Sequence, residues 1–207
     1  MINEKPEKLT FKQQSVVTAA LKLFAVKGYA NTSTKEIALT AKVSEGSIFR
    51  HFHSKEGLLL EIINPLLNSI FPAELYEFSQ MTLVPDYKDL KTFISRFINE
   101  RLDYFQTNLE TFRILLGELI YANNMRDKIL QSIPQDVISA MTKQFHDLQN
   151  KHLLVEWPDY DIFRFIFSTM IGYLAQHFIL FPEIHWNETA EKERLVDFIT
   201  QGLTPVK

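Results

Sequence analysis

The 207-residue chain contains no cysteine, only six glycines and eight prolines, and no long uninterrupted run of apolar residues. Without cysteine there is no disulfide, no thiolate zinc site and no cysteine nucleophile, and this composition suits a reducing compartment. The longest apolar runs, such as Phe178 to Phe181, are far shorter than the roughly 20 residues that span a bilayer. Residues 1–5 lack the apolar core of a secretory signal. We therefore expect a cytoplasmic protein with no membrane segment.

The sequence also lacks the short motifs of common enzyme classes. It contains no G-x-S-x-G nucleophile turn, no glycine-rich phosphate loop and no H-E-x-x-H pair. Its six histidines are scattered, and His51 and His53 cannot face the same side of one helix because they are two residues apart. We therefore expect no catalysis, no cofactor and no structural metal ion.

Charged residues are unevenly divided along the chain, although the formal net charge is only -3. Residues 1–57 carry eight Lys and one Arg against five Glu, which gives +4. Residues 58–207 carry 13 basic and 20 acidic residues, which gives -7. A small basic head therefore precedes a larger acidic body, and a basic head is compatible with binding to nucleic acid.

Apolar residues recur every three or four positions, the period of an α-helix, and no segment alternates convincingly with period two. This pattern predicts an all-α protein of about nine helices. Pro65 is expected to kink the fourth helix, and Pro134 to kink or interrupt the seventh, because proline lacks the backbone donor. The expected helices cover about residues 10–27, 34–42, 47–51, 54–67, 86–106, 109–122, 125–151, 159–180 and 187–203.

The second and third expected helices are short and joined by the tight connection Val43 to Gly46, which is typical of a helix-turn-helix. The stretch from Gly28 to Ala38, followed by that from Val43 to Leu59, resembles the tetracycline-repressor-like (TetR) family of bacterial transcription regulators. The resemblance is detailed over about residues 10–60. It implies a helix-turn-helix DNA-binding domain at 1–56 and a ligand-binding and dimerisation domain at 57–207.

One side of the third helix offers hydrogen-bond donors to the major groove of double-stranded DNA. Arg50 is predicted to read a base, since a guanidinium can bond guanine at two positions, and the resemblance implies that Lys55 holds a phosphate. Ser33 fits both a phosphate contact and a plain N-cap. The predicted DNA contacts are Ser33, Thr34, Lys42, Ser44, Glu45, Gly46, Ser47, Arg50, His51 and Lys55.

Two residues depart from the pattern of the family. Lys42 stands where the family usually has glycine, and a positive φ angle there would disfavour a side chain. Phe49 stands where the family usually has tyrosine, so it keeps the ring, loses the hydroxyl and is assigned mainly to packing. We expect neither change to abolish DNA binding.

The body contains most of the 17 Phe and seven Tyr residues. Each ring alone fits an ordinary core, but the family resemblance implies a cavity among these helices, and we expect a mainly apolar pocket for a small hydrophobic effector. Polar residues on apolar faces are further candidates, with a surface or interface salt bridge as the alternative for each. The predicted pocket residues are Phe93, Phe97, Arg101, Phe105, Phe112, Arg113, Tyr121, Phe145, His146 and Phe167.

Small residues gather on one side of the helix expected over about 159–180. Ser168, Gly172 and Ala175 would let another helix approach closely, although packing within one chain produces the same pattern. The resemblance implies that the last two helices pair with their copies in a homodimer, which one head per chain requires to read two half-sites. The predicted interface residues are Ser168, Ile171, Gly172, Ala175, Leu195, Phe198 and Ile199.

Together these patterns predict a ligand-responsive homodimeric transcription regulator, acting as a repressor on a palindromic operator. The alternative is a helical carrier or sensor of small apolar molecules whose head does not bind specific DNA. Loss of sequence-specific DNA binding on substitution of Arg50 together with Lys55 by alanine would separate the two hypotheses.

Overall fold

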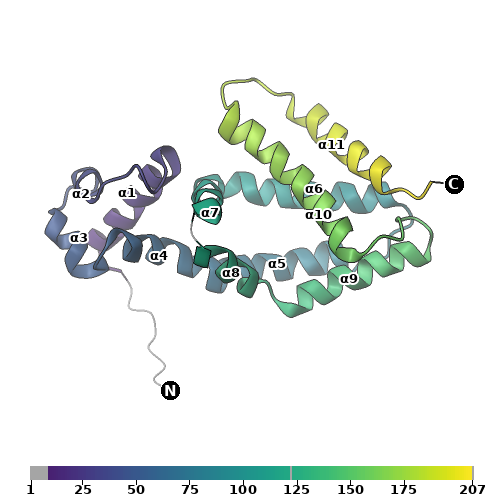
Figure 1. Cartoon of the computed structure of the whole chain (residues 1–207), viewed down its shortest axis with the longest axis horizontal. Coiled ribbons are helices and arrows are strands. Elements are labelled where there is room, and N and C mark those ends of the chain that lie inside the picture. The colour runs from purple at the N-terminus through teal and green to yellow at the C-terminus, as the bar shows by residue number, and fades with distance from the viewer. Residues whose placement is uncertain (1–8, 122, 207) are drawn as a thin grey trace, which may run out of the picture. The chain divides into compact units, whose positions relative to one another are not determined.

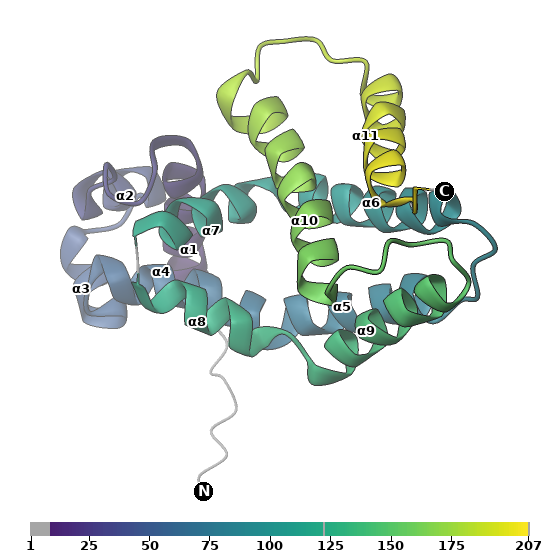
Figure 2. The same cartoon turned by 45° about the vertical axis from the view of Figure 1, so that its right-hand side comes forward.

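The computed structural model describes residues 9–121 and 123–206, with side chains described for 9–115 and 126–206. Over these residues the protein consists of eleven α-helices and three π-helical segments, and it contains no strand (Figures 1 and 2). The predicted all-α fold is confirmed. The segments in chain order are α1 (Phe11–Lys27), α2 (Thr34–Ala41), α3 (Glu45–Phe52), α4 (Lys55–Pro65), η1 (Leu66–Ile70), α5 (Phe71–Phe78), η2 (Ser79–Leu83), α6 (Leu90–Thr107), α7 (Leu109–Tyr121), α8 (Asn123–Ser132), α9 (Gln135–Asn150), α10 (Asp159–Ala175), η3 (Gln176–Leu180) and α11 (Glu188–Leu203).

The two prolines account for most of the difference from the expected helix count. Residues 125–151 were expected as one helix, but the structure separates α8 from α9 at Pro134, which lies in an extended conformation before α9. The helix that begins at Lys55 instead continues to Leu83. Directly after Pro65 the hydrogen bonding becomes π-helical, so that the N–H of Phe71 donates to the carbonyl of Leu66. The backbone N–H that Pro65 lacks is thus accompanied by a change from α-helical to π-helical hydrogen bonding.

Two helices, Lys55–Leu83 and Asp159–Leu180, are long and apolar enough by length and composition to cross a membrane. This result differs from the expectation based on uninterrupted apolar runs. Leu58 and Ile63 of the first helix and Ile162 and Ile166 of the second are fully buried against other parts of the protein. A core helix has the same composition as a membrane helix, so length and composition alone assign no membrane segment.

The chain divides by packing into two compact units. The head unit comprises the residues up to Phe71 together with Asn108–Ser132, and the body unit comprises Pro72–Thr107 together with the residues from Ile133 onward. Helices α7 and α8 therefore belong to the same unit as α1 to α4. The predicted boundary between residues 56 and 57 separates a DNA-binding from a ligand-binding domain by function, and it stays a prediction.

The core of the head unit is built from the apolar stripes of its short helices. Ile114 of α7 joins this core, which the stripes of the amino-terminal helices alone do not indicate. Burial of such side chains contributes about 1.5–3 kcal/mol each. The core residues are Val16, Ala19, Ala20, Phe24, Ile37, Ala38, Ile48, Phe52, Leu58, Leu59, Ile63, Leu67 and Ile114.

The body unit has a row of aromatic rings at its centre. Phe78 meets Phe97 at a centroid distance of 5.0 Å, Phe97 meets Phe93 at 6.0 Å, and Phe93 meets Phe145 at 6.3 Å. All three pairs meet edge to face, an arrangement that favours contact between the ring edge and the π face. These four rings therefore interdigitate closely, and none is more than 3% exposed.

Gly57 in the first turn of α4 generates a stability prediction. A Cβ atom at this position would overlap the backbone carbonyl oxygen of Phe52, which cannot move without displacing the end of α3. We expect Gly57→Ala to destabilise the protein by about 1–3 kcal/mol, as overpacking does, in urea unfolding followed by circular dichroism.

The control for this prediction is Gly46→Ala in α3. A Cβ at Gly46 meets no atom within 4 Å, so this substitution is expected to stabilise the free protein by about 0.4–1 kcal/mol. Equal stability of the two variants would contradict the clash at Gly57.

Candidate nucleic-acid interface and ligand sites

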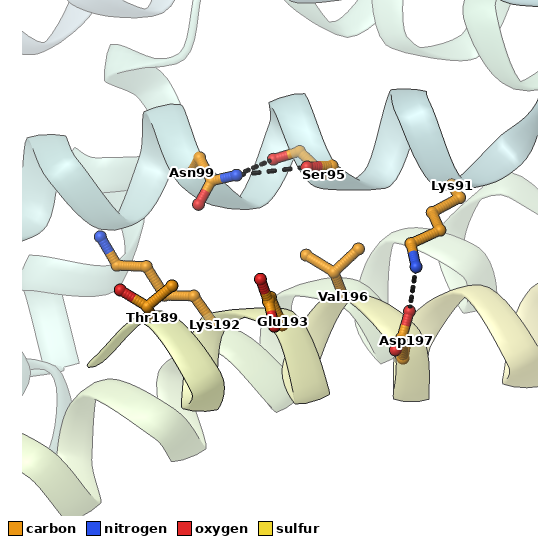
Figure 3. A pocket seen from close by; sticks show the side chains of 8 residues that line it. All are labelled: Lys91, Ser95, Asn99, Thr189, Lys192, Glu193, Val196 and Asp197. Carbon is orange, nitrogen blue, oxygen red and sulfur yellow. Dashed lines mark hydrogen bonds and ion pairs between the residues drawn. The ribbon is translucent and has the colours of Figure 1, made fainter. Parts of the chain in front are cut away.

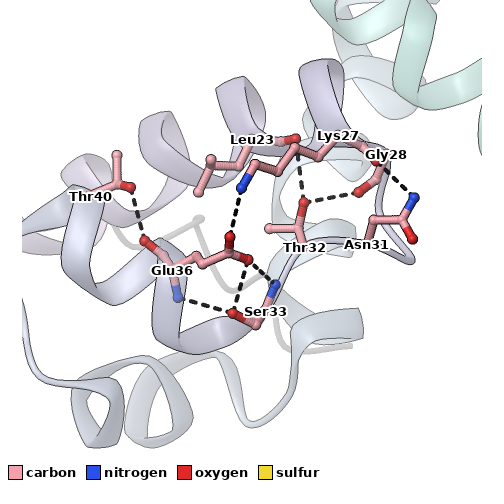
Figure 4. A network of polar contacts seen from close by, with 8 residues as sticks. All are labelled: Leu23, Lys27, Gly28, Asn31, Thr32, Ser33, Glu36 and Thr40. Atoms are coloured by element: carbon pink, nitrogen blue, oxygen red, sulfur yellow. Dashed lines mark hydrogen bonds and ion pairs between the residues drawn. The ribbon is translucent and has the colours of Figure 1, made fainter.

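The start of α2 is fixed by a capping box. The Ser33 hydroxyl accepts a hydrogen bond from the N–H of Glu36, and a carboxylate oxygen of Glu36 accepts one from the N–H of Ser33 (Figure 4). The other carboxylate oxygen binds the Lys27 ammonium at 2.6 Å, which joins α1 to α2. The hydrogen bond from Lys27, followed by those from Ser33, lowers the pKa of Glu36 to about 2. Ser33 is therefore an N-cap, one of the two roles predicted for it.

Thr32 anchors the loop between α1 and α2. Its side chain is buried, and its hydroxyl lies 2.9 Å from the carbonyl oxygen of Gly28 and 3.3 Å from that of Leu23 (Figure 4). Asn31 adds a side-chain hydrogen bond to the carbonyl of Lys27. These contacts close the carboxyl end of α1 and set the direction in which α2 begins.

The turn between α2 and α3 passes through Lys42, which adopts a left-handed conformation with φ 57° and ψ 42°. The expected preference against a side chain is therefore overridden by the surrounding hydrogen bonds. The N–H of Lys42 donates to the carbonyl of Leu39, and the N–H of Val43 donates to that of Ala38. This closure resembles the helix ends that normally favour glycine.

Helix α3 has one buried side and one exposed side. Ile48 and Phe52 are buried in the head core, whereas Gly46, Arg50 and His51 are exposed. Within the described part of the chain, no hydrogen bond or ion pair engages the Arg50 guanidinium. Its donors are therefore available for an external acceptor, as base reading requires.

Phe49 is 46% exposed, so the ring that was assigned to packing lies partly on the surface. The neighbouring Ser44 and Ser47 hydroxyls bond each other at 2.9 Å. Ser44 is the N-cap residue of α3, and Ser47 lies in the first turn of this helix. Backbone N–H groups of a first turn lack helical acceptors and can donate to an external one.

Other predicted DNA contacts are engaged within the head. The Thr34 hydroxyl donates to the Glu45 carboxylate at 2.5 Å, which connects the first turn of α2 with that of α3. His51 Nδ1 lies 3.0 Å from the Gln13 side-chain amide, which connects the end of α3 to α1. These side chains position the two helices relative to each other, and any DNA contact by them remains a prediction.

Lys55 has a role that its sequence position did not indicate. Its ammonium donates to the carbonyl oxygens of Tyr29 at 2.9 Å and Thr32 at 3.0 Å, with Ala30 at 3.5 Å. It also lies 4.3 Å from the centroid of the Tyr29 ring, within the range of a cation–π contact. In the free head, Lys55 therefore ties the start of α4 to the loop between α1 and α2.

Sequence reasoning missed the residues that organise this interface, namely Lys27, Tyr29, Thr32 and Glu36. The spacing of Ser33 and Glu36 is the known signature of a capping box and could have identified Glu36. No comparable local signal marks Tyr29 or Thr32, because their partners are backbone carbonyls and a lysine 23–26 residues away.

The predicted pocket residues do not form one group in the structure. Phe112 and Arg113 belong to the head unit, and the other described members belong to the body unit. Phe93, Phe97 and Phe145 lie in the packed aromatic row, and Arg101 is buried beside Phe78. Phe105 is half-buried next to Tyr104. Tyr121 lies outside the residues whose side chains are described.

Two predicted pocket residues lie at the surface of the body unit. The His146 side chain is 58% exposed and lies 3.4 Å from Asp159, which is the salt-bridge alternative given for it. Phe167 is 41% exposed and stacks on Phe163 at 5.4 Å. Both are therefore exposed, unlike the rings of the buried aromatic row.

The body unit also has a polar groove of about 540 Å³ between α6 and α11 (Figure 3). Lys91 crosses it to Asp197 at 2.7 Å, and Asn99 bonds back to Ser95 on its own helix. None of the predicted pocket residues lines this groove. It was not expected from the sequence, because its charged residues read as an ordinary solvated helix face.

The predicted dimer residues divide into buried and open positions. Leu195 and Ile199 are packed inside the body unit, at 9% and 4% exposure, so their side chains are used within the protomer. Phe198 is 69% exposed and Ser168 is exposed. A Cβ on Gly172 would meet no atom within 4 Å, so the space beside this glycine is open.

Comparison with known proteins places this head among bacterial regulators. A family model described as bacterial regulatory proteins, tetR family, matches residues 16–62. YuxN, an uncharacterized HTH-type transcriptional regulator of Bacillus subtilis, is 45% identical over 60 residues, which are 29% of this chain and 21% of YuxN. The match thus spans only about a fifth of that relative's length.

Solved structures are similar over nearly the whole chain. The fatty acid degradation regulator FadR from Bacillus halodurans has a TM-score of 0.67 at 17% identity, covering 95% of this chain and 98% of that one. FadR from Bacillus subtilis in complex with stearoyl-CoA has a TM-score of 0.64 at 16% identity, covering 91% of this chain and 98% of that one. At these identities the likeness shows the fold alone.

The contacts of Lys55 predict a loss of stability that is separate from any effect on DNA. Lys55→Met leaves the carbonyl of Thr32 without its donor and that of Tyr29 with the N–H of Thr32, and we expect a destabilisation of about 1–3 kcal/mol in denaturant unfolding without DNA. Lys35→Met removes an exposed lysine from α2 and should change stability by less than about 0.5 kcal/mol. Identical unfolding midpoints for both variants would refute a structural role for Lys55.

Proposed function

Because this chain belongs to the tetR family of bacterial regulatory proteins, we propose that it is a ligand-responsive repressor that binds a palindromic operator as a homodimer. The family consists of transcription regulators and not enzymes. The protein would act in the cytoplasm, where the DNA is. A small hydrophobic effector would release it from the operator.

The observation that carries the DNA-binding proposal is the division of α3 into a buried and an exposed side. Ile48 and Phe52 hold the helix in the head core, and Arg50 projects without a partner in the described residues. A helix held in this way can enter the major groove while its guanidinium reaches base edges. The net charge of +4 over residues 1–57 favours the approach to the phosphates.

The homodimer proposal is supported by the surface of α10, which is apolar on both of its sides. Ile162, Ile166 and Met170 are buried within the protomer, but an outward stripe of the same helix is exposed to solvent. A helix that is apolar all round normally has partners all round. The stripe consists of the exposed Tyr160, Phe167 and Ser168, the half-buried Ile171, Gly172 and Ala175, and the exposed Ile179 of η3, which continues α10.

The effector proposal has two supports: the aromatic content of the body unit and the ligands of structural relatives. One solved relative is named for fatty acid degradation, and the other contains stearoyl-CoA. Long-chain acyl compounds are therefore the first effectors to test. Effector and operator would be coupled by about 1–3 kcal/mol, and the coupling would be reciprocal for binding.

The regulator proposal is tested by selecting duplexes from a random DNA pool at physiological salt. We expect an inverted repeat with half-sites about one helical turn apart. Arg50→Ala should then weaken binding to the selected site by about 1–3 kcal/mol per half-site and relax the sequence preference there, because the guanidinium reads a base. Affinity and its salt dependence would be measured by fluorescence anisotropy.

Arg126→Ala is the matched control, since it removes an exposed arginine from α8 of the same unit. It should leave the sequence preference unchanged. Enrichment of no sequence, with only weak salt-sensitive binding, would contradict the regulator proposal and favour the alternative of a small-molecule carrier.

The homodimer proposal predicts that a bulky charge on the α10 stripe separates the subunits. Gly172→Arg should change the mass measured by light scattering from twice 24.2 kDa to 24.2 kDa, because no described residue of the protomer occupies the space beside this glycine. Gly46→Arg places the same side chain on an equally open helical glycine of the head and should remain dimeric. A dimeric Gly172→Arg variant would place the interface elsewhere.

A further inference from the structure

Arg101 in α6 is a buried cation for which the described residues provide no counter-charge. Its side chain is only 8% exposed. No carboxylate oxygen of the described residues lies within 4.0 Å of its guanidinium, and its Nε atom is fully covered without a hydrogen-bond partner. Buried arginines in proteins are nearly always paired, because desolvation of an unpaired charge is unfavourable.

The contacts that Arg101 does make are with aromatic rings. Its guanidinium carbon lies 4.0 Å from the centroid of the Phe78 ring and 5.3 Å from that of Tyr104. Cation–π contacts offset part of the desolvation but satisfy none of the guanidinium N–H donors. Burial lowers the pKa of Arg101 from its ordinary value, although an arginine stays protonated at neutral pH.

The nearby carboxylates do not provide the missing partner. Glu100 directly precedes Arg101 in the helix, but its two oxygens are used by Arg96 at 3.2 Å and by the Thr82 hydroxyl at 2.6 Å. Glu74 in α5 acts on Arg101 only through its electrostatic field. The guanidinium therefore retains donors that are suited to two oxygens of one external anion.

The position of Arg101 also indicates what kind of molecule carries that anion. Phe78, which stacks under the guanidinium, is the first ring of the row that continues through Phe97 and Phe93 to Phe145. A charged group at Arg101 therefore lies at one end of an apolar region. An amphipathic ligand with one oxyanion and an apolar body matches this order of groups, and because the four rings are buried and packed together, its apolar body would have to displace some of them.

We propose that Arg101 is the binding residue for the oxyanion of the effector, which is an aliphatic acid or its phosphate-bearing thioester. This inference rests on the effector-responsive function proposed above and adds the residue that binds the charged end of the ligand. A carboxylate and a phosphate offer the same pair of oxygens to a guanidinium.

The test is calorimetric titration of the full chain with three probes that share a twelve-carbon tail: dodecanoate, dodecanoyl-CoA and 1-dodecanol. We expect at least one anionic probe to bind ten or more times as tightly as the neutral alcohol. Arg101→Met should reduce the affinity for that probe to the level of the alcohol, and Arg101→Lys should restore part of the difference. The tighter anion identifies the source of the oxyanion as a free carboxylate or the thioester carrier.

Thermal unfolding without ligand separates a binding role from a structural one. If Arg101 serves ligand binding, Arg101→Met removes an unpaired buried charge and should raise the melting temperature of the free protein while it abolishes the anion preference. A purely structural arginine would give the opposite shift. Arg96→Met is the matched control on the same helix, because Arg96 is exposed and already paired with Glu100, and it should preserve the anion preference.

The proposal is overturned if the alcohol binds as tightly as both anions, if neither anion binds, or if Arg101→Met retains the preference. Binding of the selected operator is measured on the same preparations without any probe. If the unsubstituted protein does not bind the operator, the proposed regulator function is refuted. The calorimetric comparison still decides the role of Arg101 in that case.

Discussion

The burial of Ile48 and Phe52 in the head core is the constraint on which the DNA-binding surface depends. Helix α3 has only eight residues, and an isolated helix of that length is not stable in water. Its conformation and orientation are therefore provided by the two anchors, whose burial contributes about 1.5–3 kcal/mol each. Because these anchors occupy one side of the helix, Arg50 must project from the other side. The exposed surface of α3 thus follows directly from its packing.

Polar contacts then fix the directions of the helices around α3. Lys27 with Glu36 holds α1 to α2, Thr34 with Glu45 holds α2 to α3, and Lys55 holds α4 to the preceding loop. Each contact joins residues that are distant in sequence, so each orders more chain than its own hydrogen bond would indicate. Exposed ion pairs contribute little to stability on average. Their value in this head is geometric, since they determine where the donors of α3 point.

Most of the fold could be predicted from the sequence because the helices carry clear apolar stripes. The stripe of α1 and the caps at Thr10 and Ser33 are local signals, and the structure contains these helices close to the expected bounds. The fate of each proline could not be predicted in the same way. Pro134 lies in an extended conformation between α8 and α9, whereas the helix through Pro65 continues, with Leu58, Ile63 and Leu67 buried around it. That outcome depends on tertiary packing, which periodicity does not contain.

The candidate sites were less predictable than the fold because a side chain's partners are not encoded next to it. Lys55 was expected to meet phosphate, and its three hydrogens are directed at the carbonyls of Tyr29, Ala30 and Thr32. Contact with a phosphate would require the ammonium to release at least one of them, and Ala30 at 3.5 Å is the weakest. DNA binding and loop order would then draw on the same three hydrogens. The head is therefore held in part by a group that its ligand can also use, so the loop between α1 and α2 should respond when DNA binds.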